Sequence, residues 1–345
     1  YRVKKSPKEK LNFETRLKIF GYTKEDFKTI ILPMCNNGKE AIGSMGTDTP
    51  LAVLSKKPQL IYNYFKQLFA QVTNPPLDGI REEIITDTSL SLGSDYNIFN
   101  LIPDHAKKLK INNPIISNGD LEKIKYIDHD DFKACSINAN YEISKGHNGL
   151  EKALDMIVDK VEKKVDNNHN IIILSDRKTS KKYAPIPILL VCSYVHHSLI
   201  KRKKRSKFGI VIESAEPREP HHFSMLFGYG ASAINPYMVN EIIEYHHKLG
   251  FLNEQKLDKS IDNFNKAIAK GILKVMNKIG ISTLHSYRGA QIFEALGLRQ
   301  KFVSKYFNNT PSRIEGAGLY VLEKEVSSRM DSVSYTHLRA HETPV

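Results

Sequence analysis

The sequence contains no tryptophan and only three cysteines among its 345 residues. Cys35, Cys135 and Cys192 are far apart, so they lack the close pairing typical of zinc sites and iron–sulfur clusters. An odd number of scattered thiols also provides no disulfide framework and favours a reducing compartment. We therefore expect a cytoplasmic protein whose thiols are buried or incidental.

Long apolar runs are missing as well. No stretch of about 18 consecutive apolar residues is present, so no transmembrane helix is expected. The longest apolar stretch covers residues 184–200, and it is interrupted by Pro185, Pro187, His196 and His197. The first residues show no signal-peptide pattern, and the chain begins at Tyr1 instead of a methionine. We therefore expect a fragment of a longer protein, with no membrane partner.

What the chain has in excess is positive charge, with a formal net charge of +13. Most lysines are spread along the sequence, which indicates a compositional bias more than a binding face. One cluster, residues 201–207, is almost entirely basic and lies between an apolar helix and an apolar strand, where a solvated connector is expected. No aromatic residues are interleaved with it, so nucleic-acid binding is the less favoured alternative.

The N-terminal part is expected to be helical and rich in loops. Residues 11–20 predict a short amphipathic helix. Thr23, with Asp26 three residues later, resembles a capping box for a second helix that reaches about Met34. Beyond it we expect a polar loop at residues 38–50 and a helix at residues 57–69 that Pro58 opens. Mixed and irregular structure is expected at residues 80–110, and a strand region at residues 132–141.

From residue 149 onward strands alternate with helices. Residues 170–176 and 208–214 are apolar runs with polar C-terminal ends, typical of strands buried on both faces of a parallel sheet. Further strands are expected at residues 231–236 and 282–285. Helices are expected at residues 149–165, 186–201, 221–228, 239–249, 261–278 and 290–295. The pattern predicts an α/β fold of parallel β/α units with right-handed crossovers.

Polar side chains gather where these strands end, at Ser175, Asp176, Glu213, Ser214 and Asn235. In a barrel or an open parallel sheet, a binding site lies along this edge. The same residues are equally suited to cap the following loops and helices, so both interpretations stay open. The binding interpretation predicts a free-standing β/α enzyme that takes a phosphorylated ligand or flavin.

Two histidine pairs, His196-His197 and His221-His222, raise the question of a metal site. Neighbouring residues on a helix point in different directions, so neither pair is a ready chelate. The segment 213–219 is rich in acidic residues, and Arg218 can pair with carboxylates there. We therefore expect a buried hydrogen-bonded network at the sheet edge and no metal.

Glycine-containing turns are present but carry no nucleotide signature. Gly43-Ser-Met-Gly46 and Gly228-Tyr-Gly230 match neither a dinucleotide fingerprint nor a P-loop, and no nucleophile motif is found. No set of residues therefore specifies a catalytic reaction. The first turn belongs to a polar block, residues 43–54, with an echo at residues 69–78. Such loops carry function when a rigid scaffold positions them.

These two blocks, with many shorter runs in the same order, make the chain similar to the central domain of the glutamate synthase large subunit. The resemblance extends from about Leu17 to about Leu319. Its landmarks are Phe20-Gly-Tyr-Thr23 and residues 38–46, 48–55, 64–76, 80–83, 173–177, 184–187, 221–223, 228–231, 235–237 and 280–294.

The resemblance implies an α/β architecture akin to a degenerate barrel. In this family an amidotransferase domain hydrolyses glutamine, and ammonia passes through an internal tunnel. An FMN-binding barrel with an iron–sulfur cluster then reduces the imine formed from 2-oxoglutarate. The central domain lies between the two and holds no catalytic nucleophile and no cofactor. The implied partners are these domains of the same polypeptide and, as a source of electrons, a small subunit or ferredoxin.

By the same resemblance, Met45 and Thr73 match residues that line the ammonia tunnel. A flexible thioether can open or close a narrow passage, and a hydroxyl can hydrogen-bond ammonia. The chain departs from the family pattern at His285, where many relatives have glutamine. It also lacks the amidotransferase and FMN-binding domains, so the fragment alone is expected to be inactive.

The resemblance also sets the expected domain boundaries. Residues 1–319 form the central domain, and residues 320–331 begin a linker toward the FMN-binding domain. Residues 332–345 show neither the β/α pattern nor apolar periodicity, and we expect them to be a non-native tail.

Overall fold

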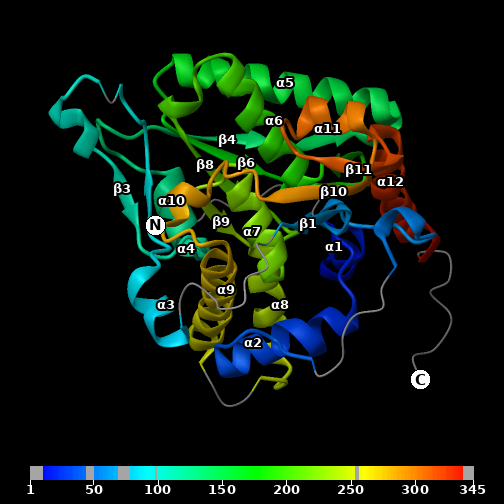
Figure 1. Ribbon diagram of the computed structural model, residues 1–345. Helices are drawn as coiled ribbons and strands as arrows, with labels where there is room; N and C mark the ends of the chain where they lie inside the picture. The colour runs from blue at the N-terminus through cyan, green and yellow to red at the C-terminus, as the bar shows by residue number, and fades with distance from the viewer. Residues whose placement is uncertain (1–10, 44–49, 69–77, 98, 253–255, 337–345) are drawn as a thin grey trace.

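The computed structural model describes residues 11–43, 50–68, 78–97, 99–252 and 256–336. Figure 1 shows a layered α/β molecule in which long helices lie around the sheets. Its centre is a parallel sheet with the strand order β4-β6-β8-β9. These strands are β4 (Ala134–Asn138), β6 (Ile171–Ser175), β8 (Gly209–Glu213) and β9 (Ala233–Asn235). The expected α/β class, built from parallel β/α units, is confirmed.

Alternate residues of the central strands enter two different hydrophobic cores. Ile172 and Ile212 belong to the larger core, which also holds apolar residues of α5 (Gly146–Asp166) and α6 (Ile188–Lys201). Ile173 and Val211 point to a smaller core, which is closed by the strands and helix β2 (Leu90–Leu92), β3 (Leu109–Ile111) and α4 (Asn118–Lys125). Because both faces are covered, β6 and β8 are apolar at nearly every position.

The helices that connect the central strands lie where the sequence predicts them. α5, α6 and α7 (Pro220–Gly228) connect successive strands, and α8 (Tyr237–Lys248) and α9 (Leu257–Ile279) follow β9. Figure 1 shows α8 and α9 side by side. β5 (Asn140–Glu142) and β7 (Tyr183–Pro185) form a separate antiparallel ribbon. β4 and β5 confirm the strand region expected at residues 132–141.

A second sheet joins distant parts of the chain in the order β1-β10-β11. β1 (Phe65–Gln67) runs antiparallel to β10 (Phe293–Leu298), and β10 runs parallel to β11 (Ser312–Ala317). The helices expected at residues 57–69 and 290–295 are therefore wrong. Their apolar residues pack as paired strands because contacts between remote segments override a local helical pattern.

The fourth parallel strand expected at residues 282–285 is also wrong. Thr283 there accepts a hydrogen bond from the Ser286 N–H and begins the short helix α10 (Leu284–Tyr287). One isolated bridge, between Asp87 and Thr283, is the only trace of strand pairing among the described residues of this segment. A polar side chain that caps a helix competes with the extended conformation. After β10 the chain forms α11 (Gln300–Tyr306).

The N-terminal part is helical, as expected. It contains α1 (Phe13–Ile19), the π-helix η1 (Asp26–Ile31) and α2 (Leu32–Asn37). The capping box is confirmed, because the Thr23 N–H donates to the Asp26 carboxylate (2.7 Å) and the Asp26 N–H donates to the Thr23 hydroxyl (3.1 Å). The later segments 38–68 and 78–110 contain mainly short elements: η2 (Ala52–Leu54), η3 (Ile61–Tyr64), α3 (Gly79–Ile85) and η4 (Pro103–Ala106).

The last described element is α12 (Leu319–Thr336), which packs against α1 and α5. Leu322, Val326 and Met330 are buried in the large core. The stretch 320–331, where we expect a linker to begin, lies within this helix. The domain boundaries remain predictions, and residues 337–345 of the expected tail lie outside the described residues.

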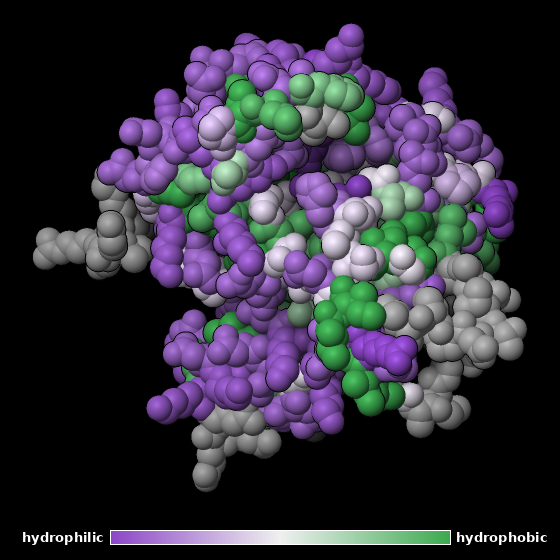
Figure 2. Space-filling model, turned by 60° about the vertical axis from the view of Figure 1, so that its left-hand side comes forward, coloured by the Kyte–Doolittle hydropathy of each residue, from purple (hydrophilic) through white to green (hydrophobic). Residues whose placement is uncertain are grey.

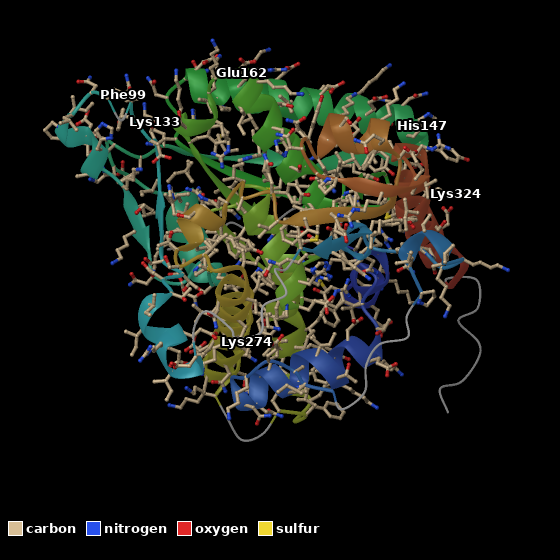
Figure 3. The ribbon with its side chains drawn as sticks, in the orientation of Figure 1. Phe99, Lys133, His147, Glu162, Lys274 and Lys324 are labelled. Atoms are coloured by element: carbon tan, nitrogen blue, oxygen red, sulfur yellow. The ribbon has the colours of Figure 1, made fainter. Side chains whose placement is uncertain are left out.

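The face seen in Figure 2 is mostly hydrophilic, with apolar residues gathered in separate patches. Phe99 and Leu101 are about nine-tenths exposed, and Figure 3 shows Phe99 at the outer end of the segment between β2 and β3. Ile80 and Ile84 form another exposed pair on α3. Among the residues described, no helix combines the length and the apolar character needed to cross a bilayer.

Gly230 offers a direct test of the packing between α6 and the turn before β9. Its φ of +108° is unfavourable for other residues, and an added Cβ would overlap the imidazole of His196. Gly230→Ala is therefore expected to lower the free energy of unfolding by about 1–3 kcal/mol. Urea denaturation provides the measurement. Gly119→Ala is the control, because a Cβ there meets only the Ser117 hydroxyl at 3.7 Å. Equal stability of the two variants would contradict this packing.

Candidate functional site

The two predicted tunnel residues, Met45 and Thr73, lie outside the described residues. The segments that flank them are described, and one flank of each loop contacts the helix α9. Before the first loop, the Glu40 carboxylate pairs with Lys274 of α9 at 3.2 Å; Figure 3 labels Lys274. Because an ion pair ties this flank to a long helix, the start of the first loop is anchored to the scaffold.

The second loop is anchored to the same helix from its far end. Glu83 of α3 pairs with Lys270 of α9 at 3.2 Å. Glu82, one residue earlier, accepts a hydrogen bond from the Asn277 amide at 2.8 Å. At the near end, the Leu68 N–H donates to the Ile292 carbonyl beside β10. Lys270 lies one helical turn from Lys274, so one face of α9 holds flanks of both loops.

The C-terminal edge of the central sheet contains the polar network that the sequence predicts. Asp176 is completely buried. Its carboxylate accepts hydrogen bonds from the Ser214 hydroxyl, the Ala215 N–H and, at 2.7 Å, the Tyr237 hydroxyl. Burial raises the pKa of Asp176 to about 6, although the bonds from Ser214 and Tyr237 act in the opposite direction.

Glu216 is the second buried carboxyl of this network. It accepts a hydrogen bond of 3.1 Å from the Ile188 N–H at the first residue of α6. Burial raises the pKa of Glu216 to about 7, and the neighbouring Asp176 charge adds to the rise. Arg329 of α12 and Arg218 partly offset this effect. The network therefore connects the sheet edge to α6 and α12.

Glu213 shows the opposite balance of forces. It is buried, yet it contacts Lys125 of α4 at 2.9 Å and Arg177 at 2.6 Å. Burial by itself favours the neutral acid, but the Arg177 and Lys125 cations hold the pKa of Glu213 below its usual range. The Arg177 guanidinium also lies over the Tyr237 ring, 4.1 Å from its centroid. These cations close the edge from the solvent side.

The chemistry of this edge does not suit a phosphorylated ligand. Its innermost groups are carboxylates, which repel phosphate, and Asp176 already accepts hydrogen bonds from neighbouring protein groups. Asn235 donates to the Ile116 carbonyl and to Asn118, and so joins β9 to α4. Of the two interpretations left open by the sequence, capping and internal bonding therefore describes these residues better than ligand binding.

The histidine pairs belong to packing networks. His222 contacts Glu219 at 2.9 Å and stacks on Tyr62, with ring centroids 4.2 Å apart. His196 accepts a hydrogen bond from Arg205 at 2.9 Å. Across the described part of the chain, no group of three histidine, cysteine or acidic side chains is arranged to hold a metal ion.

Arg218 pairs with a carboxylate, but its partner is Asp26 in the N-terminal segment and not an acidic residue of the segment 213–219. It contacts the Asp26 carboxylate at 3.4 Å, donates to the Phe20 and Gly21 carbonyls, and stacks on Tyr22. A guanidinium suits this position because its planar fork reaches several acceptors at once.

The basic cluster 201–207 is bound to the protein itself. Arg202 and Lys204 pair with acidic residues of α5, namely Asp159, Glu162 and Asp166. Arg205 turns inward and donates to the Phe208 and Gly230 carbonyls. Ion pairs engage two of the six basic side chains and Arg205 is turned inward, which supports a structural connector more than a nucleic-acid interface.

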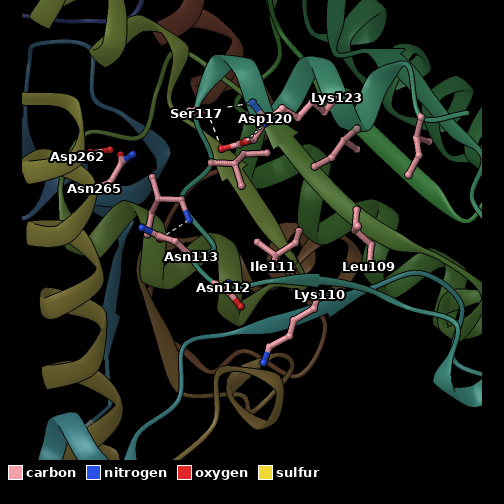
Figure 4. A pocket seen from close by; sticks show the side chains of 14 residues that line it. Leu109, Lys110, Ile111, Asn112, Asn113, Ser117, Asp120, Lys123, Asp262 and Asn265 are labelled. Atoms are coloured by element: carbon pink, nitrogen blue, oxygen red, sulfur yellow. Dashed lines mark hydrogen bonds and ion pairs between the residues drawn. The ribbon is translucent and has the colours of Figure 1, made fainter. Parts of the chain in front are cut away.

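Sequence reasoning missed a cleft of about 570 Å³ between β3, α4 and α9 (Figure 4). Its polar lining includes Asn112 and Asn113 after β3, Asp120 of α4, and Asp262 and Asn265 of α9. The only sequence signal was the adjacent asparagine pair, which by itself is typical of a turn. The other lining residues come from segments far apart in the chain, so no local pattern could have revealed the cleft.

The raised pKa of Glu216 predicts a pH-dependent stability. Between about pH 4.5 and about pH 7 the folded state retains a proton that the unfolded state releases, so stability falls as pH rises. Glu216→Gln keeps an acceptor for the Ile188 N–H but removes this titration. Relative to the variant, the wild type is expected to lose on the order of 3 kcal/mol over this range.

Urea denaturation at about pH 5 and about pH 8 measures this difference. Glu122→Gln, on the exposed side of α4, is the matched control. If the difference between wild type and Glu216→Gln stays constant across this range, the buried position of the carboxyl is contradicted.

The chain is 41% identical to the glutamate synthase [NADPH] large chain of Bacillus subtilis over 315 residues, covering 91% of this chain and 20% of that protein. It is 42% identical to a glutamate synthase [NADH] of Schizosaccharomyces pombe, covering 86% and 14% respectively. For the ferredoxin-dependent glutamate synthase 2 of Synechocystis the identity is 38%, covering 89% and 20%.

Solved structures add little. A mutant flavocytochrome b2 with sulfite bound aligns with 67% of this chain and 45% of its own, at 11% identity and a TM-score of 0.34. A likeness this weak supports no functional argument.

The chain spans about one fifth of the length of the Bacillus subtilis large chain. A family model described as the glutamate synthase central domain matches residues 15–299. That match covers most of the chain and agrees with the sequence landmarks, so the chain belongs to the glutamate synthase central domain family.

Proposed function

We propose that this chain acts as the central domain within a glutamate synthase polypeptide. In that position it links a glutamine amidotransferase domain to an FMN-binding synthase domain and lines the ammonia passage between them. The observation that carries the proposal is the family match together with the anchoring of both polar loops to α9. A passage for ammonia needs loops held at fixed positions by a rigid element.

The proposed parent reaction converts glutamine, 2-oxoglutarate, two electrons and two protons into two molecules of glutamate. This chain contributes positioning and no bond-making step. Met45 supplies a flexible thioether at the passage, and the Thr73 hydroxyl exchanges hydrogen bonds with ammonia in transit. The domains on either side, and a small electron-supplying subunit or ferredoxin, are the proposed partners.

The residues of this chain do not fit the cofactors of the parent enzyme. Cys35 and Cys192 are buried, and burial raises the pKa of both thiols to about 12. Cys35 lies in α2, Cys192 in α6 and Cys135 on β4, and the described residues contain no group of three thiol, imidazole or carboxylate side chains arranged for a cluster. The acidic sheet edge is equally unsuited to the FMN phosphate. Both groups therefore belong to other domains, and the free thiols support a cytoplasmic location.

Obstruction of the passage tests this function in the full-length enzyme. Met45→Trp is expected to lower glutamate synthesis from glutamine by roughly tenfold, equivalent to about 1.4 kcal/mol. Glutamine hydrolysis is expected to continue, so free ammonia accumulates. The ratio of glutamate formed to ammonia released is the measurement. Thr73→Val, which removes only the hydroxyl, is expected to change this ratio in the same direction.

Met156→Trp is the matched control, because Met156 is an exposed methionine on α5. It is expected to leave the ratio unchanged. The tunnel assignment is lost if Met45→Trp and Met156→Trp give the same ratio of products.

A free-standing flavin or phosphate enzyme is the competing function, and binding by the isolated chain separates the two. Because Asp176, Glu213 and Glu216 occupy the sheet edge, the isolated chain is expected not to bind FMN or inorganic phosphate. Titration followed by flavin fluorescence and calorimetry measures this. Stoichiometric binding that an Asp176 substitution abolishes would favour the competing function.

A further inference from the structure

The cleft between β3, α4 and α9 has the composition of a binding groove for a polypeptide. Its floor is apolar, formed by side chains that include Ile111, Ile116 and Ile124. Its rim is polar and exposed. Figure 4 shows the rim residues coming from all three elements around an open space. An apolar centre within a polar rim is the common anatomy of protein interfaces.

One wall of the cleft is the edge of a strand. Leu109, Lys110 and Ile111 all line it, although successive residues of a strand point to opposite faces. Figure 4 shows Leu109 and Ile111 on one side of β3 and Lys110 on the other. The cleft therefore runs along the edge of β3. Within the described residues β3 pairs only with β2, so its other edge has no strand partner.

Asn265 of α9 lies at the inner wall of the same cleft. Its side chain is only 6% exposed, and its buried amide oxygen has no hydrogen-bond partner. Buried amides are normally bonded, because a group removed from water otherwise loses its partners. Asn263, two residues earlier, shows the usual case and donates to the Cys35 carbonyl at 2.8 Å. The Asn265 amide is suited to the main-chain groups of an extended peptide.

The charges of the rim favour a polypeptide over an anion. Lys123 pairs with Asp120 at 3.2 Å within α4, which leaves Lys110 and Asp262 on opposite walls. Together, one positive and one negative side chain carry no net charge that would attract phosphate or nucleic acid. They match the mixed charge of an ordinary protein segment.

We propose that an extended segment of the same polypeptide occupies this cleft by adding a strand to the free edge of β3. Main-chain hydrogen bonds to β3 would supply affinity, and the apolar floor would receive alternate side chains. The source is the chain outside this region, since the Bacillus subtilis relative is about five times as long as the part matched here. The inference rests on the proposed function, because it requires that this chain is part of such a longer polypeptide.

Hydrogen exchange tests the pairing directly. The amides of residues 109–113 are expected to exchange at least tenfold more slowly in the full-length polypeptide than in the isolated chain. Cross-links from Lys110, mapped by mass spectrometry, identify the segment that lies on β3. Equal exchange in both proteins overturns the proposal, as does strong protection in the isolated chain.

The variant Asn265→Leu tests whether a segment occupies the cleft. In the isolated chain the variant is expected to melt at the same or a higher temperature, because the buried amide oxygen that it removes has no hydrogen-bond partner. In the full-length polypeptide it is expected to reduce the protection of β3. Unchanged protection there overturns the proposal.

Asn263→Leu is the matched control on the same helix. It breaks an existing hydrogen bond and is expected to lower the melting temperature in both proteins. Asn265→Ala serves if leucine prevents folding. These readouts do not involve ammonia transfer, so they can fail while the Met45 experiment succeeds, and the reverse.

Discussion

The burial of the central strands on both faces is the constraint on which the rest of the structure depends. Both faces of the parallel strands are covered, and in this protein the polar groups at their C-terminal ends are buried as well. These groups find partners within the protein instead. Asp176 is bonded to the loop after β8 and to α8, Glu213 to α4 and the loop after β6, and Glu216 to α6. The edge that serves as a binding site in many α/β proteins is used here to connect elements.

Helix α9 contacts both the flanks of the polar loops and the cleft beside β3. Its ion pairs with Glu40 and Glu83 hold the flanks of both polar loops. Another of its residues, Asn265, lines the cleft beside β3. One rigid helix thus positions the proposed ammonia passage and the proposed docking groove. This arrangement suits a domain whose role is to hold neighbouring domains in register.

Local patterns predicted the parallel β/α region well and the second sheet badly. The strands at Ile171–Ser175 and Gly209–Glu213 are apolar throughout, because both faces are buried. Phe65–Gln67 and Phe293–Leu298 are separated by more than 200 residues, and their apolar spacing also fitted a helix. Only their mutual pairing decides that they are strands.

The sequence by itself determined the family, the α/β class and the polar residues at the strand ends, because these depend on local composition and motif order. Tertiary structure alone decided that Asp176 is satisfied internally, that Glu40 and Glu83 meet the same helix, and that a cleft opens beside β3. These features depend on contacts between remote segments. The apolar periodicity of a segment does not specify which distant segment it will contact.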